Sequence, residues 1–422
     1  MTILKPISKP ILFLFLGLSM LVINPRINGW NEASRMALTQ SLVEQHRFSI
    51  DESVFVSTGD KVFIGNHFYS DKPPLPSLLA ALVYYPLYHA GFDLDFGWNL
   101  AYFLIILLTV KMFWLLSVLA FSRSLEYTPA SIQHRHWFVL LFAFTSLSFT
   151  WSATFNNHSM AGSSLMIAFL FYIKGISRKE KYSLLWSGVF FGLAGAMDIP
   201  TSIFFIGFAV LIFLNQRNGH NSRLFLLGGL IPIGIHLGIN YSIGGTLLPL
   251  QIIPEFFNYE GSTWIGSDTL SGVESNSLYF TLKYACLSLL GPRGFLWYNP
   301  ILLLLIPLAI RAIRRRGFLR AEAVIILSCS IILLTYYFVF SSNFGGWSYS
   351  IRWFIPILPL LYIFIYDIEY MLHVKHGKQL LYILIGTATL IAIVGQINPW
   401  SSPEYNSVPF LANLQQLVGL FL

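Results

Sequence analysis

The chain is poor in charge and in cysteine. Only 11% of its 422 residues are charged, whereas 55% are hydrophobic and 16% aromatic. An ordinary soluble domain has about 25% charged residues, so this composition argues against a water-soluble fold, whose core would need more polar surface around it. The two cysteines, Cys286 and Cys329, argue against a disulfide framework, and no Cys/His spacing typical of a metal site occurs.

Long apolar runs recur along the chain. A run of about 20 apolar residues crosses a bilayer as a helix, so the sequence predicts an all-α polytopic membrane protein with about eleven transmembrane helices. The predicted spans are residues 11–24, 99–122, 137–153, 158–174, 183–197, 199–215, 223–243, 295–310, 321–342, 353–370 and 379–396. The first lacks a small-residue cleavage site before Pro25, so we interpret it as a retained anchor.

The density of Lys and Arg alternates from loop to loop. With the N-terminus in the cytoplasm, most of the 26 Lys and Arg residues fall on inner segments, and most acids fall outside. This positive-inside pattern predicts a single membrane domain over residues 1–422, with outer loops at 25–98 and 244–294 and an outer tail at 397–422. The net charge of +7 then reflects topology and contact with anionic lipid heads, and no nucleic-acid partner is expected.

The helix expected after Pro76, over residues 77–91, is short for a span. Counting it as one would invert every later loop and place the cluster from Arg311 to Arg320 outside. We therefore predict a juxtamembrane or re-entrant helix on the outer side. The compact loops and the absence of a large soluble domain favour a bacterial plasma (inner) membrane.

The segment GNHFYSDKPPLPSLL, residues 65–79, carries the clearest chemical signal. Asp71 and Lys72 follow Tyr69 directly and precede two prolines that stiffen the backbone before an apolar helix. An acidic and a basic side chain fixed side by side at a membrane surface could hold an anionic lipid head group next to a proton acceptor. We therefore predict a chemical site in the first outer loop.

A second cluster, WNEASR, begins at Trp30, just after the first span. Asn31, Glu32 and Arg35 stand at the start of a predicted helix. Glu32 and Arg35 have i, i+3 spacing, so a surface ion pair explains them as well as a catalytic site does.

These motifs together resemble a known family. NEASR after the first span, with DKPPL before a helix, is similar to bacterial members of the dolichyl-phosphate-mannose protein mannosyltransferase superfamily, which are GT-C type membrane glycosyltransferases and include the lipid A aminoarabinose transferases. Further matches are TFNNHS at 154–159, GLAGAMDIP at 192–200, GPRGFLWYNP at 291–300 and GGWSYSIRWFIPILP at 345–359.

The resemblance implies transfer of a sugar from a polyprenyl-phosphate donor to an acceptor on the outer face, without a metal or other cofactor. The family places its catalytic base at the start of the first loop, where Glu32 matches. Its usual Asp-Glu pair is here Asn31-Glu32, so which of the two faces the acceptor stays open. Asp71 matches the second acid.

A carboxylate within hydrogen-bond reach takes the proton of the attacking hydroxyl. Cations around the leaving phosphate stabilise the charge that it gains. The resemblance gives this role to Arg35, Lys72 and Arg352, although Arg352 could equally anchor the chain at the interface beside Trp353.

Several other polar residues are candidates for substrate binding: Asn31, Tyr69, His158, Asp198 and Arg293. His158 and Asp198 lie at predicted span ends, where a histidine more often makes an interfacial hydrogen bond and an acid more often caps a helix. Arg293 fits an interfacial anchor beside Trp297 equally well.

Two other classes of membrane protein fit the composition. A transporter or flippase of lipid-linked sugars also has many spans, but it usually shows paired charges at the midplane and two corresponding halves. A glycan polymerase or ligase would use a diphosphate donor. The sugar and the acceptor stay open, and the residues available to select them in the second outer loop are Glu255, Tyr259, Trp264 and Asp268.

Overall fold

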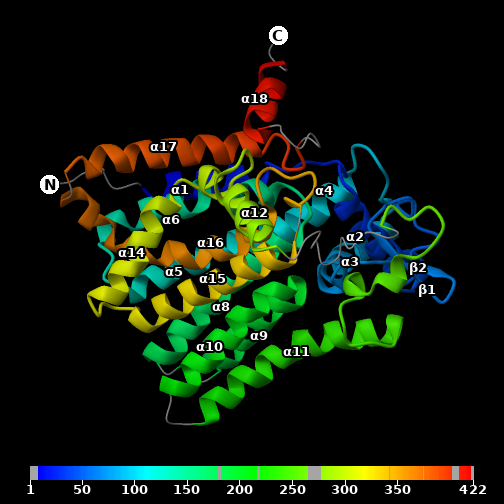
Figure 1. Cartoon of the computed structure of the whole chain (residues 1–422), viewed down its shortest axis with the longest axis horizontal. Coiled ribbons are helices and arrows are strands. Elements are labelled where there is room, and N and C mark those ends of the chain that lie inside the picture. Colours follow the sequence, from blue (N-terminus) through cyan, green and yellow to red (C-terminus); the bar gives the residue numbers. More distant parts are fainter. Residues whose placement is uncertain are drawn as a thin grey trace.

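The structure is a computed structural model of the chain, and it describes residues 8–178, 180, 182–215, 219–264, 277–341, 343–373, 375–401 and 408–419. Asp268 and parts of the second outer loop and of the tail lie outside these residues. The described part is mostly helical, with one two-stranded sheet. Its long helices run side by side along one direction, and the short elements α2, α3, β1 and β2 gather at one end (Figure 1).

The helices of the bundle, which share an apolar composition, are α1 Lys9–Met20, α4 Leu100–Ile106, α5 Met112–Ser124, α6 Arg135–Phe144, α7 Leu147–Thr150, α8 Asn157–Arg178, α9 Ser183–Met197, α10 Ser202–Asn215, α11 Gly219–Gly244, α12 Leu278–Leu290, α13 Phe295–Tyr298, α14 Leu302–Arg314, α15 Arg320–Phe340, α16 Leu358–Leu361 and α17 Gly377–Gly395. Helix α18, Pro409–Gly419, projects from the bundle (Figure 1). A π-helical turn, Leu107–Lys111, joins α4 to α5, and 3-10 turns flank α16. The elements at the end of the bundle are α2 Trp30–Gln40, β1 Lys61–Ile64, β2 His67–Ser70 and α3 Pro74–His89.

Nine of the eleven predicted spans coincide largely with one continuous helical segment, whereas 137–153 and 295–310 are each divided by a bend. The bend within 137–153 is 59°, between Phe144 and Leu147. Among the described residues, six helices are long and apolar enough to cross a membrane, and up to eight if each of two bent pairs counts as one span. Three more, Lys9–Met20, Ser183–Met197 and Ile199–Asn215, are apolar but shorter. The multi-pass helical architecture is therefore confirmed, whereas the number of eleven spans stays a prediction.

The predicted span 295–310 is wrong as a single straight helix. The chain bends by 89° between the segments Leu278–Tyr298 and Leu302–Arg314. Pro300 disfavours continuation of the helix through this point, and the Asn299 side chain accepts a hydrogen bond from the Leu147 backbone N–H. Helix α12 also occupies part of the predicted outer loop 244–294, which is therefore not simply a loop.

The sequence explains the two elements that carry the DKPP segment. Gly65 and Asn66 have φ values of 57° and 68°, as a two-residue type I′ hairpin turn requires. Strands β1 and β2 then pair from Ile64 opposite His67 to Lys61 opposite Ser70. Helix α3 begins at Pro74, where a missing N–H costs nothing, and it lies beside α2 at the end of the bundle (Figure 1).

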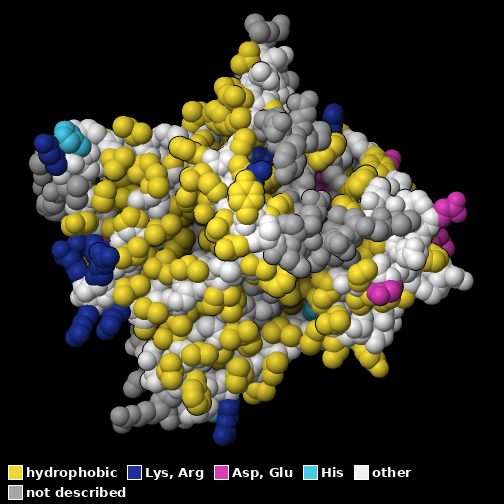
Figure 2. Space-filling view, viewed as in Figure 1, with side chains coloured by type: hydrophobic (Ala, Val, Ile, Leu, Met, Phe, Trp, Pro, Cys, Tyr) yellow, Lys and Arg dark blue, Asp and Glu magenta, His cyan; other side chains and the backbone are white. Residues whose placement is uncertain are grey.

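Charge separates along the long direction of the molecule. Apolar side chains cover the body, most visible Lys and Arg gather at the end where α14 meets α15, and the visible Asp and Glu gather at the opposite end, over the hairpin (Figure 2). Exposed Phe213, Leu214 and Ile383 are among the apolar side chains that would face lipid. This separation agrees with the predicted topology, in which the basic end is cytoplasmic.

We expect that an external thiol reagent distinguishes the two ends. With Cys286 and Cys329 replaced, Asn66→Cys should react with an impermeant maleimide in intact cells, and Arg316→Cys should react only after permeabilisation. Asn66 is exposed at the hairpin turn and Arg316 is exposed between α14 and α15. The reverse labelling pattern would overturn the orientation.

Candidate functional site

A cavity of about 610 Å³ opens at the end of the bundle that carries the hairpin. Its walls come from the first outer loop, from residues around 251–264, from the Gly345–Gly346 loop and from Trp400. The lining residues are Asn28, Gly29, Trp30, Asn31, Asp60, Asp71, Lys72, Gln251, Phe257, Trp264, Asn343, Gly345, Gly346, Trp347, Arg352 and Trp400. Segments more than 300 residues apart in sequence therefore build one site.

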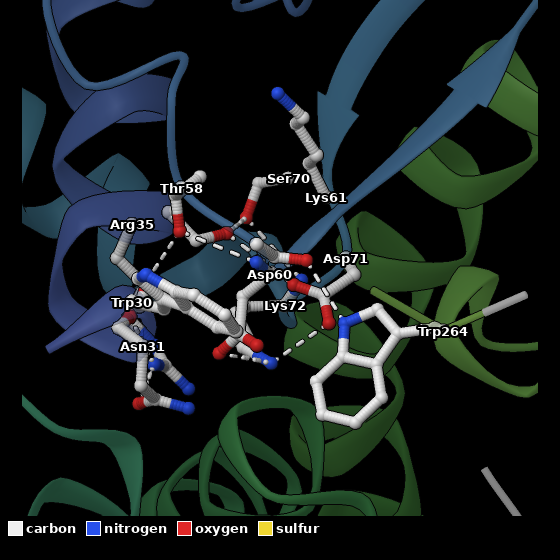
Figure 3. A network of polar contacts seen from close by, with 12 residues as sticks. Trp30, Asn31, Arg35, Thr58, Asp60, Lys61, Ser70, Asp71, Lys72 and Trp264 are labelled. Carbon is white, nitrogen blue, oxygen red and sulfur yellow. Dashed lines mark hydrogen bonds and ion pairs between the residues drawn. The ribbon is translucent and has the colours of Figure 1, made fainter. Parts of the chain in front are cut away.

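Two carboxylates and one ammonium group form the polar centre of this cavity. Lys72 Nζ lies 2.7 Å from Asp71 Oδ2 and 2.9 Å from Asp60 Oδ2, and Figure 3 shows Lys72 between the two acids. The hairpin register explains the pairing, because Asp60 precedes β1 and Asp71 follows β2, directly beyond the Lys61–Ser70 pair. All three side chains line the cavity.

Asp71 is largely buried although it reaches the cavity. Burial raises the pKa of Asp71, and the Asp60 carboxylate raises it further, while Lys72 acts in the opposite direction. The Ser34 hydroxyl of α2 lies 3.3 Å from Asp71 Oδ1 and 2.7 Å from the Ser70 hydroxyl, which ties β2 to α2. Asp71 is thus a carboxylate with a fixed position and an elevated proton affinity.

Asn31, not Glu32, is the member of the NE pair that lines the cavity. Glu32 is 0% exposed. Its carboxylate accepts hydrogen bonds from the hydroxyls of Tyr102 and Thr154 and from the backbone N–H groups of Asn28, at 2.9 Å, and Phe155, at 3.3 Å. Burial raises the pKa of Glu32, and the hydrogen bonds oppose that rise. Glu32 therefore joins α2 to α4 and to the segment before α8.

Arg35 is also buried, with 1% exposure, and does not line the cavity. Its guanidinium donates to the Asn31 carbonyl at 2.9 Å, to the Asn31 side chain, and to Asn157 Oδ1 at 2.7 Å. Burial lowers the pKa of Arg35 to about 10, so it stays charged at neutral pH. No Glu32–Arg35 ion pair forms among the described residues, and Arg35 holds Asn31 at the cavity wall instead.

Arg352 also lines the cavity wall, beside the Gly345–Gly346 loop. Its guanidinium lies over the Trp400 ring, 4.8 Å from the ring centroid. Its Nε is buried without a hydrogen-bond partner, and no carboxylate of the described chain forms an ion pair with it. Arg293 donates to the Gly346 carbonyl at 2.7 Å and so supports the glycine loop without lining the cavity.

The remaining predicted site residues lie outside the lining. His158 Nδ1 and Asp198 Oδ2 are 2.8 Å apart, both buried, at the ends of α8 and α9. Tyr69 lies on β2 opposite Val62. Of the second-loop candidates, Trp264 lines the cavity, whereas Glu255 and Tyr259 do not.

The sequence prediction missed Asp60, Trp30, Asn343 and Trp400 as lining residues. For Asp60 a signal existed, because a Gly-Asn two-residue turn between two β-rich runs fixes the register that sets residue 60 opposite residue 71. The other three depend on tertiary packing and carry no local signal. Across the part of the chain that the structure describes, no group of three or more His, Cys, Asp or Glu is arranged to hold a metal ion.

No protein-family model matches the chain, and no curated protein matches it in sequence. Solved structures do match it in fold. ArnT from Cupriavidus metallidurans bound to undecaprenyl phosphate aligns with 92% of this chain and 69% of its own, at 13% identity and a TM-score of 0.53. Its apo form aligns with 91% of this chain and 62% of its own, at 13% identity and a TM-score of 0.54.

The oligosaccharyltransferase of Archaeoglobus fulgidus aligns with 97% of this chain and 56% of its own, at 14% identity and a TM-score of 0.49. The chain thus spans about two thirds or less of the length of these proteins. At such low identity the alignment with ArnT establishes the architecture alone. The chain shares the membrane-protein fold of ArnT, the fold that the sequence resemblance predicts.

Proposed function

We propose that this protein is a membrane glycosyltransferase that moves a sugar from a polyprenyl-phosphate donor to an acceptor on the outer face. The observation that carries the proposal is one cavity whose wall includes both a buried carboxylate with raised pKa, Asp71, and a cation, Arg352, that forms no ion pair with any acid of the described residues. Sugar transfer from a lipid phosphate needs a proton acceptor and a phosphate-binding cation in one cavity.

Arg352 is the residue that we assign to the donor phosphate. A guanidinium in a cavity, with a buried Nε that lacks a partner, is incompletely paired until an anion arrives. A phosphate accepts two parallel hydrogen bonds from such a group. The two glycines beside it, Gly345 and Gly346, have positive φ values of 86° and 65°, a conformation that glycine adopts readily.

Lys72 can contribute to the same step. An ammonium group has three N–H donors, and Asp60 and Asp71 engage two of them. The third can donate to an oxygen of a phosphate that Arg352 holds. Because both acids already bind Lys72, we assign Lys72 a secondary role beside Arg352.

We assign the general base to Asp71. The acceptor oxygen would attack the anomeric carbon while its proton passes to the Asp71 carboxylate, and the bond from that carbon to the phosphate oxygen would break to release polyprenyl phosphate. Glu32, the base that the family resemblance implies, is sealed from the cavity by its own hydrogen-bond partners. Asn31 has no proton-accepting carboxylate. The resemblance assigns Arg35 to the donor phosphate. We instead assign it the role of holding Asn31 in place, because its guanidinium donates to Asn31.

The fold supports a polyprenyl-phosphate donor. ArnT, whose fold this chain shares, has been solved with undecaprenyl phosphate bound. The apolar body and the cavity at its acidic end would let a lipid tail lie in the bilayer while the head group reaches Arg352.

Product analysis tests the proposal. Purified protein, given a sugar-linked undecaprenyl phosphate and a membrane extract as acceptor source, should release undecaprenyl phosphate. A polymerase or ligase would release a diphosphate from a diphosphate donor. Release of neither product, with donor moved across vesicles instead, would identify a flippase and overturn the proposal.

The pH dependence of transfer should respond to Asp60. A general base works only when deprotonated, so the rate should fall as the pH drops through the pKa of Asp71, which lies above the ordinary value of about 3.9. The Asp60 charge raises that pKa, so Asp60→Asn should shift the acidic limb of the rate profile to lower pH. A shift to higher pH, or none, would contradict the assignment of Asp71.

A further inference from the structure

We infer that the part of the cavity around Asp60, Asp71 and Lys72 binds a neutral carbohydrate and presents one of its hydroxyl groups as the acceptor. The same part of the cavity rejects acceptors that carry a phosphate or carboxylate at this position. The inference rests on the proposed function and names the acceptor class for the same site. Three features carry it: aromatic walls, amide groups, and the two carboxylates in contact with Lys72.

Tryptophan makes up much of the cavity wall. Four of the eleven tryptophans of the chain line it: Trp30, Trp264, Trp347 and Trp400. Trp400 lies under Arg352, whereas Trp30 and Trp264 flank the acids in Figure 3. Flat aromatic faces bind the apolar C–H faces of sugar rings while leaving the hydroxyls at the ring edge to polar groups.

The two tryptophans beside the acids are held in place by one glycine. The Trp264 indole N–H donates to the Gly59 carbonyl at 2.9 Å. A Cβ at residue 59 would lie 2.5 Å from two carbons of the Trp30 ring, so only glycine lets the ring pack this closely. Thr58 Oγ1 donates to the Trp30 carbonyl at 2.9 Å. Trp30 nevertheless keeps 50% of its surface exposed, so a fixed ring face is available to a ligand.

Neutral amides supply most of the other polar lining. Asn28, Asn31, Gln251 and Asn343 all line the cavity. The Oδ1 of Asn31 accepts from Arg35, and the Oδ1 of Asn343 accepts from the Gly345 N–H at 2.9 Å. The groups of Asn31 and Asn343 that can bind a ligand are therefore chiefly their NH2 groups. Amide N–H donors and carboxylate acceptors together match a hydroxyl group, which both accepts and donates a hydrogen bond.

The charges beside these rings disfavour an anion. Asp60 and Asp71 both pair with Lys72, so the side chains in contact here are two acids and one base. The buried Arg35 and the partly buried Arg352 also act on these acids, but neither forms an ion pair with them among the described residues. A phosphate or carboxylate placed here would face two carboxylates, and such like-charge contacts in a partly dry cavity are unfavourable. A sugar hydroxyl donates to the same carboxylates. Arg352, which favours anions, lies at the Trp400 part of the wall and is assigned to the donor.

Binding of simple probes tests the acceptor class. The purified full chain, in a detergent without a sugar head group, is titrated with a panel of neutral methyl glycosides and disaccharides, with the corresponding sugar 6-phosphates, and separately with undecaprenyl phosphate. Tryptophan fluorescence and calorimetry report binding. We expect that at least one neutral glycoside binds and that its 6-phosphate binds at least about tenfold more weakly.

Four variants locate the binding site. Trp30→Ala should weaken binding of the neutral glycoside by about three- to tenfold, with less than a twofold change for undecaprenyl phosphate, and Trp264→Ala gives the same test if Trp30→Ala does not fold. Trp297→Ala is the matched control, because Trp297 is exposed and lies outside the lining. Asp60→Asn should reduce the difference in binding affinity between a neutral glycoside and its 6-phosphate.

The outcomes separate this inference from the proposed function. If undecaprenyl phosphate binds and no neutral glycoside does, or if the 6-phosphates bind more tightly, the acceptor class is wrong while the donor proposal stands. If the protein transfers sugar to a Ser- or Thr-containing peptide and binds no glycoside, the acceptor class is again wrong while the donor proposal stands. If undecaprenyl phosphate fails to bind the wild-type chain, the proposed function fails first.

Discussion

Replacing Asp71 with Asn should reduce the rate of sugar transfer by about 10² to 10⁴-fold, the usual contribution of a general base. Asn keeps the size of Asp and can still accept the hydrogen bond from Ser34, but it cannot take a proton. The protein should therefore stay folded and keep its affinity for undecaprenyl phosphate. The measurement is release of undecaprenyl phosphate from a sugar-linked donor, together with the melting temperature in detergent. Glu52→Gln is the matched control, because Glu52 is an exposed acid paired with Arg47 outside the cavity.

Glu32→Gln distinguishes this assignment from the one that the sequence predicted. If Glu32 is the base, Glu32→Gln should nearly abolish transfer at an unchanged melting temperature. With Asp71 as the base, Glu32→Gln should mainly destabilise the fold, because the Gln NH2 would meet donors that now bind a carboxylate. A buried donor without an acceptor costs about 1 to 3 kcal/mol. An active Asp71→Asn beside a stable and inactive Glu32→Gln would return the catalytic role to Glu32.

Arg352→Ala should weaken use of the donor by about tenfold to a hundredfold, because a hydrogen bond to a charged group contributes about 1.5 to 3 kcal/mol. The loss should appear as a higher KM for the lipid-linked donor and as weaker binding of undecaprenyl phosphate, with little change in melting temperature, since no acid of the described chain pairs with Arg352. Arg352→Lys should recover part of the loss but not the bidentate contact.

Arg26→Ala is the control for a general change of charge near the outer loop, because Arg26 is exposed and lies outside the cavity. Unchanged donor kinetics in Arg352→Ala would rule out the phosphate assignment. A collapse of melting temperature in Arg352→Ala, with recovery in Arg352→Lys, would instead indicate that stacking on Trp400 is structural.

The sequence determined the class of fold and the end of the molecule that carries the site. Apolar runs must become helices in a bilayer, because every backbone polar group there needs an internal partner. The positions of Lys and Arg divided the loops into two sets, and in Figure 2 most visible Lys and Arg lie at the end opposite the visible Asp and Glu. Asp71, Lys72 and Arg352 were predicted as site residues, and all three line the cavity.

The sequence could not decide which side of α2 faces the cavity. Successive helical residues differ by about 100° in direction, so Asn31 and Glu32 point to different neighbours. Every residue from Asn31 to Gln40 is buried, and a helix buried on all sides has no polar face from which its orientation can be read. The buried environment of Glu32 depends on Tyr102 and Thr154, which are 70 and 122 residues away.

The cavity itself was decided only by tertiary structure. Asp60 meets Lys72 through a hairpin, Trp264 reaches Gly59 across 205 residues, and Trp400 reaches Arg352 from a later segment. Helix bends at residues 145–146 and 299–301 lie between packed helices, where neighbouring side chains satisfy the freed backbone groups. Local sequence determines the helices and the hairpin because their hydrogen bonds are local. The cavity forms where the ends of these elements meet, and packing between distant segments determines those contacts.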